Sequence, residues 1–280
     1  CFFPVNRGLP AGQVVLGKYA GGGYNFGGKI DDVRLYSRAL SQAEITTLYG
    51  AKEAIIGKTQ STGSLATGLV GHWTFDGGKT TWTSSTAGTA TDSSGSGNTG
   101  TITNATQSAF PTDGVIGQAG NFDGTDDYVV MPNMSSINNI SYTSISFWMK
   151  RNGASQNCAA IFSQYTSATC DTDILVNPAC AAAIGASDVL YVIRSDTSNT
   201  YGYTTNGPIA DNTWTHVVGV FDGTQSDNPG RLKIYLNGVS QSLGFLGTIP
   251  ATTCSTNTAA AVLGNYTGLT RYFKGQMDDV

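Results

Sequence analysis

The sequence is poor in charge, and this shortage limits the partners that the chain can have. Only 12% of its 280 residues are charged, and the formal net charge is −4. Lysine and arginine form no cluster, so the chain lacks the positive patch that binds nucleic acid or an anionic membrane surface. No apolar run approaches the roughly 20 residues that span a bilayer. We therefore expect no nucleic-acid partner and no membrane insertion within this segment.

Glutamate and histidine are also scarce, which removes common catalytic groups. Of the 19 acidic residues only Glu44 and Glu53 are glutamates, and His72 and His216 are the two histidines. Because aspartate favours turns and glutamate favours helices, this bias indicates strands and loops. Each histidine stands beside a tryptophan in an apolar stretch, where we expect it to pack within a sheet rather than act as a base.

None of the five cysteines forms a Cys-x-x-Cys pair, which argues against a thiolate zinc site. Four cysteines fall in segments that we expect to be loops, and two disulfides among them would tie these loops together. The four candidates are Cys158, Cys170, Cys180 and Cys254. Unpaired loop thiols are the alternative, and the pairing cannot be read from the spacing. Disulfides would indicate a secreted protein, extracellular or at a cell surface.

The chain contains parts of two copies of one repeat. Residues 15–19, Val-Leu-Gly-Lys-Tyr, return as residues 262–266, Val-Leu-Gly-Asn-Tyr. In the same register and without a gap, residues 26–33 return as residues 273–280, with Asp-Asp-Val at the end of both. A second copy of one strand, turn and strand explains this match.

The repeat predicts three parts in the chain. Residues 1–50 are expected to be the C-terminal part of a preceding repeat, and residues 51–67 a linker rich in small and polar residues. Residues 68–280 are expected to form a second repeat that lacks its last strand and helix. The helix is predicted from the first copy, where Ser41-Gln42-Ala43-Glu44 is a capping box.

Alternating polarity predicts strands over most of the second repeat. Ile145, Phe147 and Met149 alternate with more polar neighbours, and Asn237-Gly238 after another alternating run is typical of a type I′ hairpin. Further strands are expected at 69–75, 127–132, 188–194, 213–221 and 272–280. Many short strands without a long helical pattern predict an all-β fold, a two-sheet antiparallel sandwich with one short helix after the final strand.

Several stretches of the chain resemble, in order, the laminin-G-like domains of the concanavalin A-like lectin/glucanase jelly-roll class. They are residues 30–36, 68–76, 92–100, 120–129, 214–223 and the hairpin at 237–238. Together they cover nearly all of 68–280 and the tail at 14–50, and they imply a jelly-roll sandwich. The cysteine-bearing insertion around 152–186 departs from the family pattern, and we expect it to remodel a loop at one end of the sandwich.

The same class includes retaining glycoside hydrolases, which resemble one another in a Glu-x-Asp-x-Glu strand that holds two carboxylates ~5.5 Å apart. The two glutamates of this chain, Glu44 and Glu53, lie in the capping box and the linker, so it cannot build that strand. Asp126 and Asp127 are adjacent and would point to opposite faces of a strand. The chain is therefore predicted not to be an enzyme.

The resemblance also implies a structural calcium site. The loop from Asp92 to Asn98 is rich in glycine and oxygen ligands, as calcium requires. In the family, the aspartates of the final strands approach this loop, which here suggests Asp278, and Asp76 is a weaker fourth ligand. An Asx turn in a solvated loop is the alternative.

Glycan binding would need exposed aromatic rings beside polar groups. The candidates are Tyr165, Tyr201, Tyr203, Tyr266 and Tyr272, at expected loops or strand ends. Ordinary half-buried packing is the simpler explanation for tyrosines in a β-rich chain.

These observations favour a non-enzymatic extracellular tandem-repeat protein with an adhesive or fibre-forming role. Its expected partners are neighbouring copies of itself, adjacent repeats and glycans, since a surface poor in charge repels its copies only weakly. The alternative is a carbohydrate-binding module attached to an enzyme outside this segment.

Overall fold

The computed structural model describes one region of the chain. The described residues are 68–152, 159–167, 170–176, 189–195, 200–205, 209–255, 260–265 and 272–280. The chain divides into the units Cys1–Ala54 and Ile55–Val280, and the described residues belong to the second unit. The capping-box helix expected after Leu40 lies outside them.

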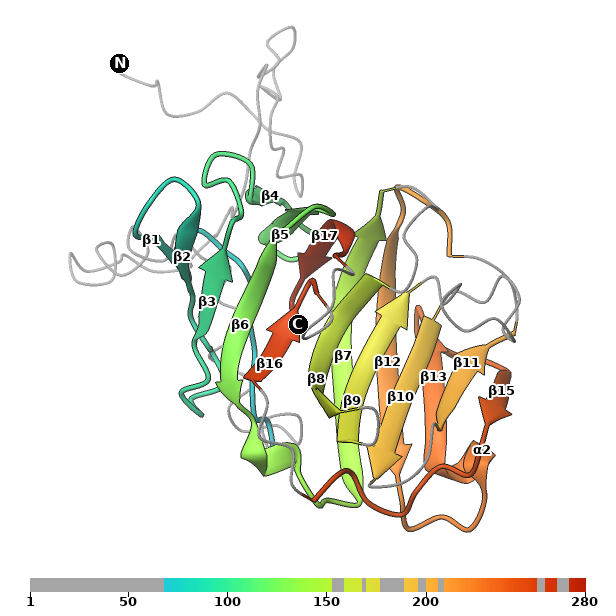
Figure 1. The fold of residues 1–280 in the computed structure, drawn as a ribbon. Coiled ribbons are helices and arrows are strands. Elements are labelled where there is room, and N and C mark those ends of the chain that lie inside the picture. The colour runs from blue at the N-terminus through green and yellow to red at the C-terminus, as the bar shows by residue number, and fades with distance from the viewer. Residues whose placement is uncertain are drawn as a thin grey trace, which may run out of the picture. The chain divides into compact units, whose positions relative to one another are not determined.

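Two antiparallel sheets form the fold (Figure 1). The first has ten strands, in the spatial order β1 (Thr80–Trp82), β2 (Ala87–Ala90), β3 (Gly100–Thr103), β6 (Tyr128–Asn133), β16 (Ala260–Leu263), β8 (Ala159–Ser167), β9 (Cys170–Val176), β10 (Val189–Ser195), β11 (Tyr201–Thr204) and β15 (Leu243–Leu246). The second has seven, in the order β14 (Val239–Ser240), β13 (Leu232–Leu236), β12 (Trp214–Asp222), β7 (Tyr142–Arg151), β17 (Lys274–Asp278), β5 (Gln118–Asp123) and β4 (Pro111–Asp113).

Helices play a small part in the described region. A 3₁₀ turn, η3 (Ser135–Ile137), follows β6, and one short α-helix, α2 (Asn228–Arg231), precedes β13. Asp227 caps α2 by accepting a hydrogen bond from the backbone of Gly230. Among these residues no helix has the length and apolar character that a membrane crossing requires. The prediction of an all-β, two-sheet antiparallel sandwich is confirmed.

The core lies between the two sheets and follows the two-residue period of the strands. In β7, Phe147 and Met149 are fully buried, and Val217, which pairs with Phe147 from β12, is equally buried. Phenylalanines extend the core toward the other end of the sandwich, where the rings of Phe110 and Phe122 meet edge to face at 5.3 Å. The positions between the inward residues face away from the core.

The hairpin between β13 and β14 has the predicted form. Asn237 has φ 50° and Gly238 has φ 77°, so both central residues adopt the left-handed conformation that a type I′ turn requires.

Two expectations about strands are wrong in detail. Residues 69–75 form an extended segment rather than a ladder strand, and Trp73 exchanges backbone hydrogen bonds of 2.8 and 3.1 Å with Val280. The insertion around 152–186 is not simply a loop, because β8 and β9 lie within the ten-stranded sheet and pair with each other. Small residues made this segment resemble a loop, yet Ala159 and Ala160 are buried in the sheet.

The close approach of β17 to β7 depends on Gly275. A side chain at this position would collide with the backbone oxygen of Lys150 and the ring of Phe273. We predict that Gly275→Ala lowers the free energy of unfolding by about 2–3 kcal/mol through this overpacking. The matched control is Gly238→Ala, which has a similar need for positive φ but open space around it, and should lose only about 1 kcal/mol. Equal losses in denaturant melts would contradict the collision.

Candidate functional site

The loop predicted to hold calcium is organised around the carboxylate of Asp92. Its Oδ1 accepts hydrogen bonds from the backbone N–H groups of His72 at 3.0 Å and Ser94 at 2.8 Å. Its Oδ2 accepts from the Ser94 hydroxyl and from the N–H of Asn98, both at 2.9 Å. Burial alone would raise the pKa of Asp92, but these donors outweigh it and hold the pKa below its ordinary value.

Asn98 is drawn into the same loop by its neighbours. Its side-chain amide donates to the backbone carbonyl of Val70 at 2.6 Å, and its backbone carbonyl accepts from the indole of Trp73 at 3.0 Å. The loop therefore holds the opening segment against the sandwich through hydrogen bonds between protein groups. This is the geometry of the Asx-turn alternative, and calcium binding here stays a prediction.

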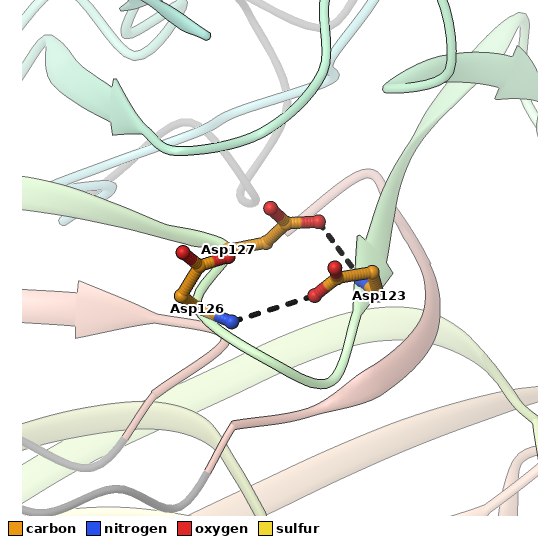
Figure 2. Close-up of side chains that lie close together, drawn as sticks. All are labelled: Asp123, Asp126 and Asp127. Atoms are coloured by element: carbon orange, nitrogen blue, oxygen red, sulfur yellow. Dashed lines mark hydrogen bonds between the residues drawn. The ribbon is translucent and has the colours of Figure 1, made fainter.

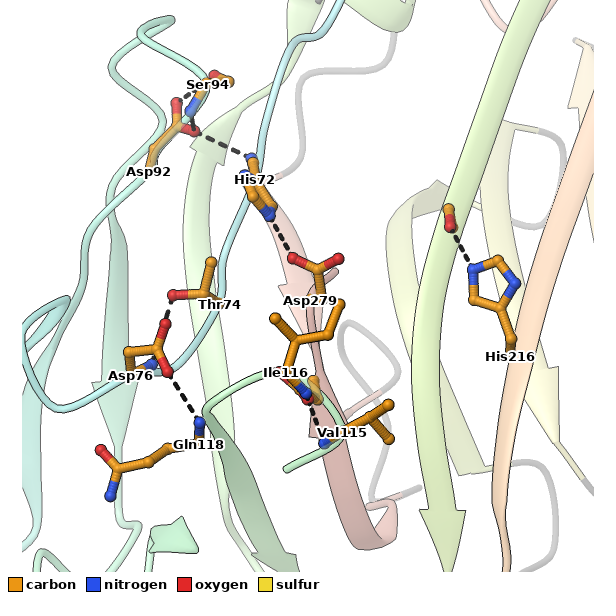
Figure 3. A network of polar contacts seen from close by, with 12 residues as sticks. His72, Thr74, Asp76, Asp92, Ser94, Val115, Ile116, Gln118, His216 and Asp279 are labelled. Carbon is orange, nitrogen blue, oxygen red and sulfur yellow. Dashed lines mark hydrogen bonds and ion pairs between the residues drawn. The ribbon is translucent and has the colours of Figure 1, made fainter. Parts of the chain in front are cut away.

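A second group of polar contacts joins the opening segment to the end of β17 (Figure 3). His72 Nε2 lies 2.5 Å from Asp279 Oδ1, and Asp279 has φ 50°, an uncommon conformation for a residue other than glycine. This hydrogen bond raises the pKa of His72 against the lowering effect of burial. His72 thus lies in a half-exposed polar contact and not in the interior of a sheet.

Asp278 is fully buried beneath the turn after β4. Its Oδ2 accepts from the N–H groups of Val115 at 2.6 Å and Ile116 at 2.7 Å, while its Oδ1 has no hydrogen-bond partner. Burial raises the pKa of Asp278 to about 6, although the two N–H donors lower it and the nearby carboxylates of Asp279 and Asp76 raise it.

Asp76, the fourth predicted calcium ligand, accepts a hydrogen bond from the backbone of Gln118 at 2.8 Å (Figure 3). The structure does not gather the predicted set, because the oxygens of Asp76, Asp92 and Asp278 do not lie within 4.8 Å of one another as a group. Each of the three carboxylates instead ties a different segment to its neighbour.

Three other aspartates do come together among the described residues. Oxygens of Asp123, Asp126 and Asp127 all lie within 4.8 Å of one another, in the turn between β5 and β6 (Figure 2). We call this group the aspartate triad. Asp123 accepts from the N–H of Thr125 at 2.7 Å, and Asp127 accepts from the N–H of Asp123 at 2.8 Å. Two oxygens bound to one calcium ion at 2.3–2.6 Å can be at most about 5 Å apart, so the spacing fits a single ion.

Burial and crowding change the acidity of this group. Asp127 is 5% exposed, and burial raises its pKa to about 6. The N–H of Asp123 lowers this pKa, and the carboxylates of Asp123 and Asp126 raise it further. A bound cation would remove the repulsion among the three carboxylates.

The sequence reasoning missed the triad because it placed Asp126 and Asp127 on a strand. Both residues precede β6, which begins at Tyr128, so the rule that neighbours point to opposite faces does not apply. The signal was present as Asp123-Gly124-Thr125-Asp126-Asp127, a run of oxygen ligands around a glycine with φ 81°.

The predicted sugar-binding tyrosines differ in their exposure. Tyr201 is 5% exposed and packs on Tyr203 at 6.2 Å, so it offers no free ring face in this structure. Tyr203 is half-buried, and so is Tyr272, whose ring lies 6.3 Å from that of Tyr128. Tyr266 and the side chain of Tyr165 lie outside the described residues.

Of the four disulfide candidates, Cys254 is described in full. It is 2% exposed, and its sulfur is disulfide-bonded. Cys170 begins β9, while Cys158 and Cys180 lie outside the described residues. The pairing of the four stays a prediction.

The two antiparallel sheets, with a jelly-roll-like order of strands and polar turns at their ends, define a jelly-roll β-sandwich protein. The laminin-G family model described as "Concanavalin A-like lectin/glucanases superfamily" matches residues 4–46 and 123–280. The chain therefore belongs to this superfamily, as its resemblance predicted. None of the curated proteins matches it.

A solved structure supports the fold. Domain 4 of AbnA, a GH43 extracellular arabinanase from Geobacillus stearothermophilus solved with arabinotriose, is 20% identical and has a TM-score of 0.51. The match covers 75% of this chain and 89% of that domain. The binding domain of botulinum neurotoxin serotype D is 14% identical with a TM-score of 0.47, and the match covers 75% of this chain and 46% of that one.

The raised pKa values predict a pH dependence of stability. Asp127, Asp278 and His72 all have folded-state pKa values above their ordinary ones, so each contributes stability that is full at low pH and is lost as the pH rises through the folded value. With a chelator present, we expect the protein to melt at a higher temperature near about pH 5 than near about pH 8.

The variant Asp127→Asn should flatten part of this profile, because asparagine still accepts the N–H of Asp123 but has no proton to lose as the pH rises. The expected difference is roughly 1 kcal/mol after allowance for solvent screening, measured by calorimetry. Asp113→Asn, which removes an exposed carboxylate at the end of β4, is the control and should leave the profile unchanged. A wild-type profile that rises from about pH 5 to about pH 8 would overturn the assignment.

Proposed function

We propose that this chain is a non-enzymatic carbohydrate-binding domain of an extracellular tandem-repeat protein that acts in adhesion. The observation that carries the proposal is the half-buried ring pair of Tyr128 and Tyr272 next to the aspartate triad. Tyr128 directly follows Asp127, and Tyr272 lies just before Lys274, which pairs with Asp123. Aromatic rings for stacking and oxygen ligands for an ion thus occupy one end of the sandwich.

Each part has a physical role in sugar binding. The apolar face of a sugar ring stacks on an aromatic ring, and the tyrosine hydroxyl remains available to the sugar hydroxyls. Calcium at the triad would hold the turn between β5 and β6 in place and keep open positions for oxygen ligands, since it accepts six to eight of them. We propose this site for calcium in place of the loop at Asp92.

A binding role rather than a catalytic one fits the chemistry of the triad. Asp127 is 5% exposed and bound to the backbone of its own turn, so it is poorly placed to reach a glycosidic oxygen. Domain 4 of the arabinanase AbnA, which shares the fold, was solved with arabinotriose, and this supports a sugar ligand here.

A structural role in a fibre is the second candidate. The repeated sequence at 15–33 and 262–280 and the low charge of 12% favour association between neighbouring repeats or copies. This role predicts ordered assembly without selective binding of any sugar, so one set of measurements separates the two functions.

The test is a glycan array with and without a calcium chelator, using the whole chain. We expect calcium-dependent binding to one class of sugar. Tyr272→Ala should weaken it about tenfold, which corresponds to ~1.4 kcal/mol of lost stacking. The matched control is Tyr142→Ala, because Tyr142 is 63% exposed but lies at the start of β7, away from the triad.

Asp126→Asn tests the metal site separately. Asp126 is exposed and repels the other two carboxylates, so its neutralisation should not lower the calcium-free melting temperature, while it weakens the stabilisation by calcium at least several-fold in apparent Kd. Asp92→Asn should show the opposite pattern, with lower stability but the same response to calcium. A folded protein that binds no sugar, with or without calcium, would contradict the carbohydrate-binding function and favour the structural role in a fibre.

A further inference from the structure

A second aromatic surface lies on the outer face of the seven-stranded sheet, on the strands β7, β12 and β13. Directly opposite residues of an antiparallel pair share a face, so the register identifies its members. Trp214 pairs with Lys150 and His216 pairs with Trp148, all on the face opposite to Phe147. We call these residues, with Ser146 and Tyr235 from the next row, the aromatic strip.

The members of the strip are preorganised by contacts with one another. The ammonium of Lys150 lies 5.3 Å from the centre of the Trp214 ring, within cation–π range. The rings of Trp148 and His216 are 5.0 Å apart, and His216 Nε2 lies 2.9 Å from the hydroxyl of Ser146. Both tryptophans are only half-buried, so parts of their rings remain accessible.

The strip and the row beside it carry two lysines on a protein that is negative overall. Lys150 lies on this face opposite Trp214. Lys233 lies on the same face, because it pairs with Val220, which is an even number of residues from Trp214 on β12. Between Ser144 and Lys150 on β7, and between Trp214 and Val220 on β12, no outward position holds an acid. The acids on this face of β7, β12, β13 and β17 are Asp222, the next outward position on β12, which interacts with Lys233 and is hydrogen-bonded by Thr224 and Gln225, and the buried Asp278, which lies opposite Trp148 on β17.

The carboxylates at the end of the neighbouring strand β17 are already engaged. Asp279 lies 2.5 Å from His72 (Figure 3), and Oδ2 of Asp278 accepts from the N–H groups of Val115 and Ile116. Neither is bound to Lys150, so this lysine faces no competing partner on the strip other than the ring of Trp214.

We propose that the aromatic strip binds an extended polysaccharide whose sugars carry carboxylates, that is, a uronic-acid chain. A sheet face is open along its length and suits a chain that lies across several strands, and the indoles offer flat surfaces to the sugar rings. Lys150 and Lys233 supply the cations for carboxylates, and Ser146 and His216 supply hydrogen bonds to hydroxyls. The row of Lys233 lies six residues along β12 from the row of Lys150, roughly 20 Å, so each lysine would meet the carboxylate of a different sugar, whereas most charges of a polysulfate would find no partner.

This inference concerns a different face from the tyrosine pair and the aspartate triad. The strip needs no calcium and no residue of the turn between β5 and β6. Binding at the strip and binding at the proposed calcium site can therefore fail independently.

The experiment measures binding of a polygalacturonate oligomer to the whole chain by calorimetry with a chelator present, beside a neutral galactan of equal length. We expect polygalacturonate to bind, and Lys150→Gln and Trp214→Ala each to weaken it at least about tenfold. Raising the salt should weaken wild-type binding more than binding by Lys150→Gln. Lys79→Gln, which removes a lysine just before β1 in the other sheet, is the matched control and should bind as the wild type does.

Three outcomes would overturn the inference: no binding of polygalacturonate by the folded wild type, equal losses for Lys150→Gln and Lys79→Gln, or tighter binding of a sulfated dextran than of polygalacturonate. If Trp214→Ala does not fold, Lys150→Gln carries the test, because its side chain points away from the core. Tyr272→Ala, which alters the other site, should bind polygalacturonate as the wild type does, so that loss of one function is not mistaken for loss of both.

Discussion

The two-residue period of β7 and β12 is the constraint on which the rest of the structure depends. It directs Phe147, Met149 and Val217 into the core and turns Trp148 and His216 outward in the same stretch of chain. A shift of one residue in either strand would exchange these two sets, so the burial of the first set fixes the exposure of the second. The hydrophobic core and the polar surface of this sheet are therefore settled by a single register.

Much of the fold followed from local patterns in the sequence. The alternation around Phe147 and the Asn237-Gly238 turn predicted strands and a hairpin that the structure contains, because both signals act over a few residues. β8 and β9 were not foreseen, since Ala159 and Ala160 have no marked preference for strands. Their place in the sheet comes from long-range pairing and burial, which a local sequence pattern does not report.

The candidate sites were harder to predict, for a related reason. The family resemblance pointed to Asp92 as the centre of its loop, but only the fold shows that four protein donors surround its carboxylate. Asp126 and Asp127 were treated as strand residues, whereas the turn before β6 brings them to Asp123. The strip around Lys150 and Trp214 depends on which strands are neighbours, and that information is not local to either residue.

The pairing of Trp73 with Val280 has a mechanical consequence. These two residues belong to the segment before β1 and the segment after β17, which run antiparallel and are joined by two backbone hydrogen bonds. In a chain of such domains, tension applied at this point would break the two hydrogen bonds one after another instead of loading both at once in shear. This edge would yield at low force, ahead of the long β7–β12 ladder, and would let an array lengthen in small steps before any sandwich is lost.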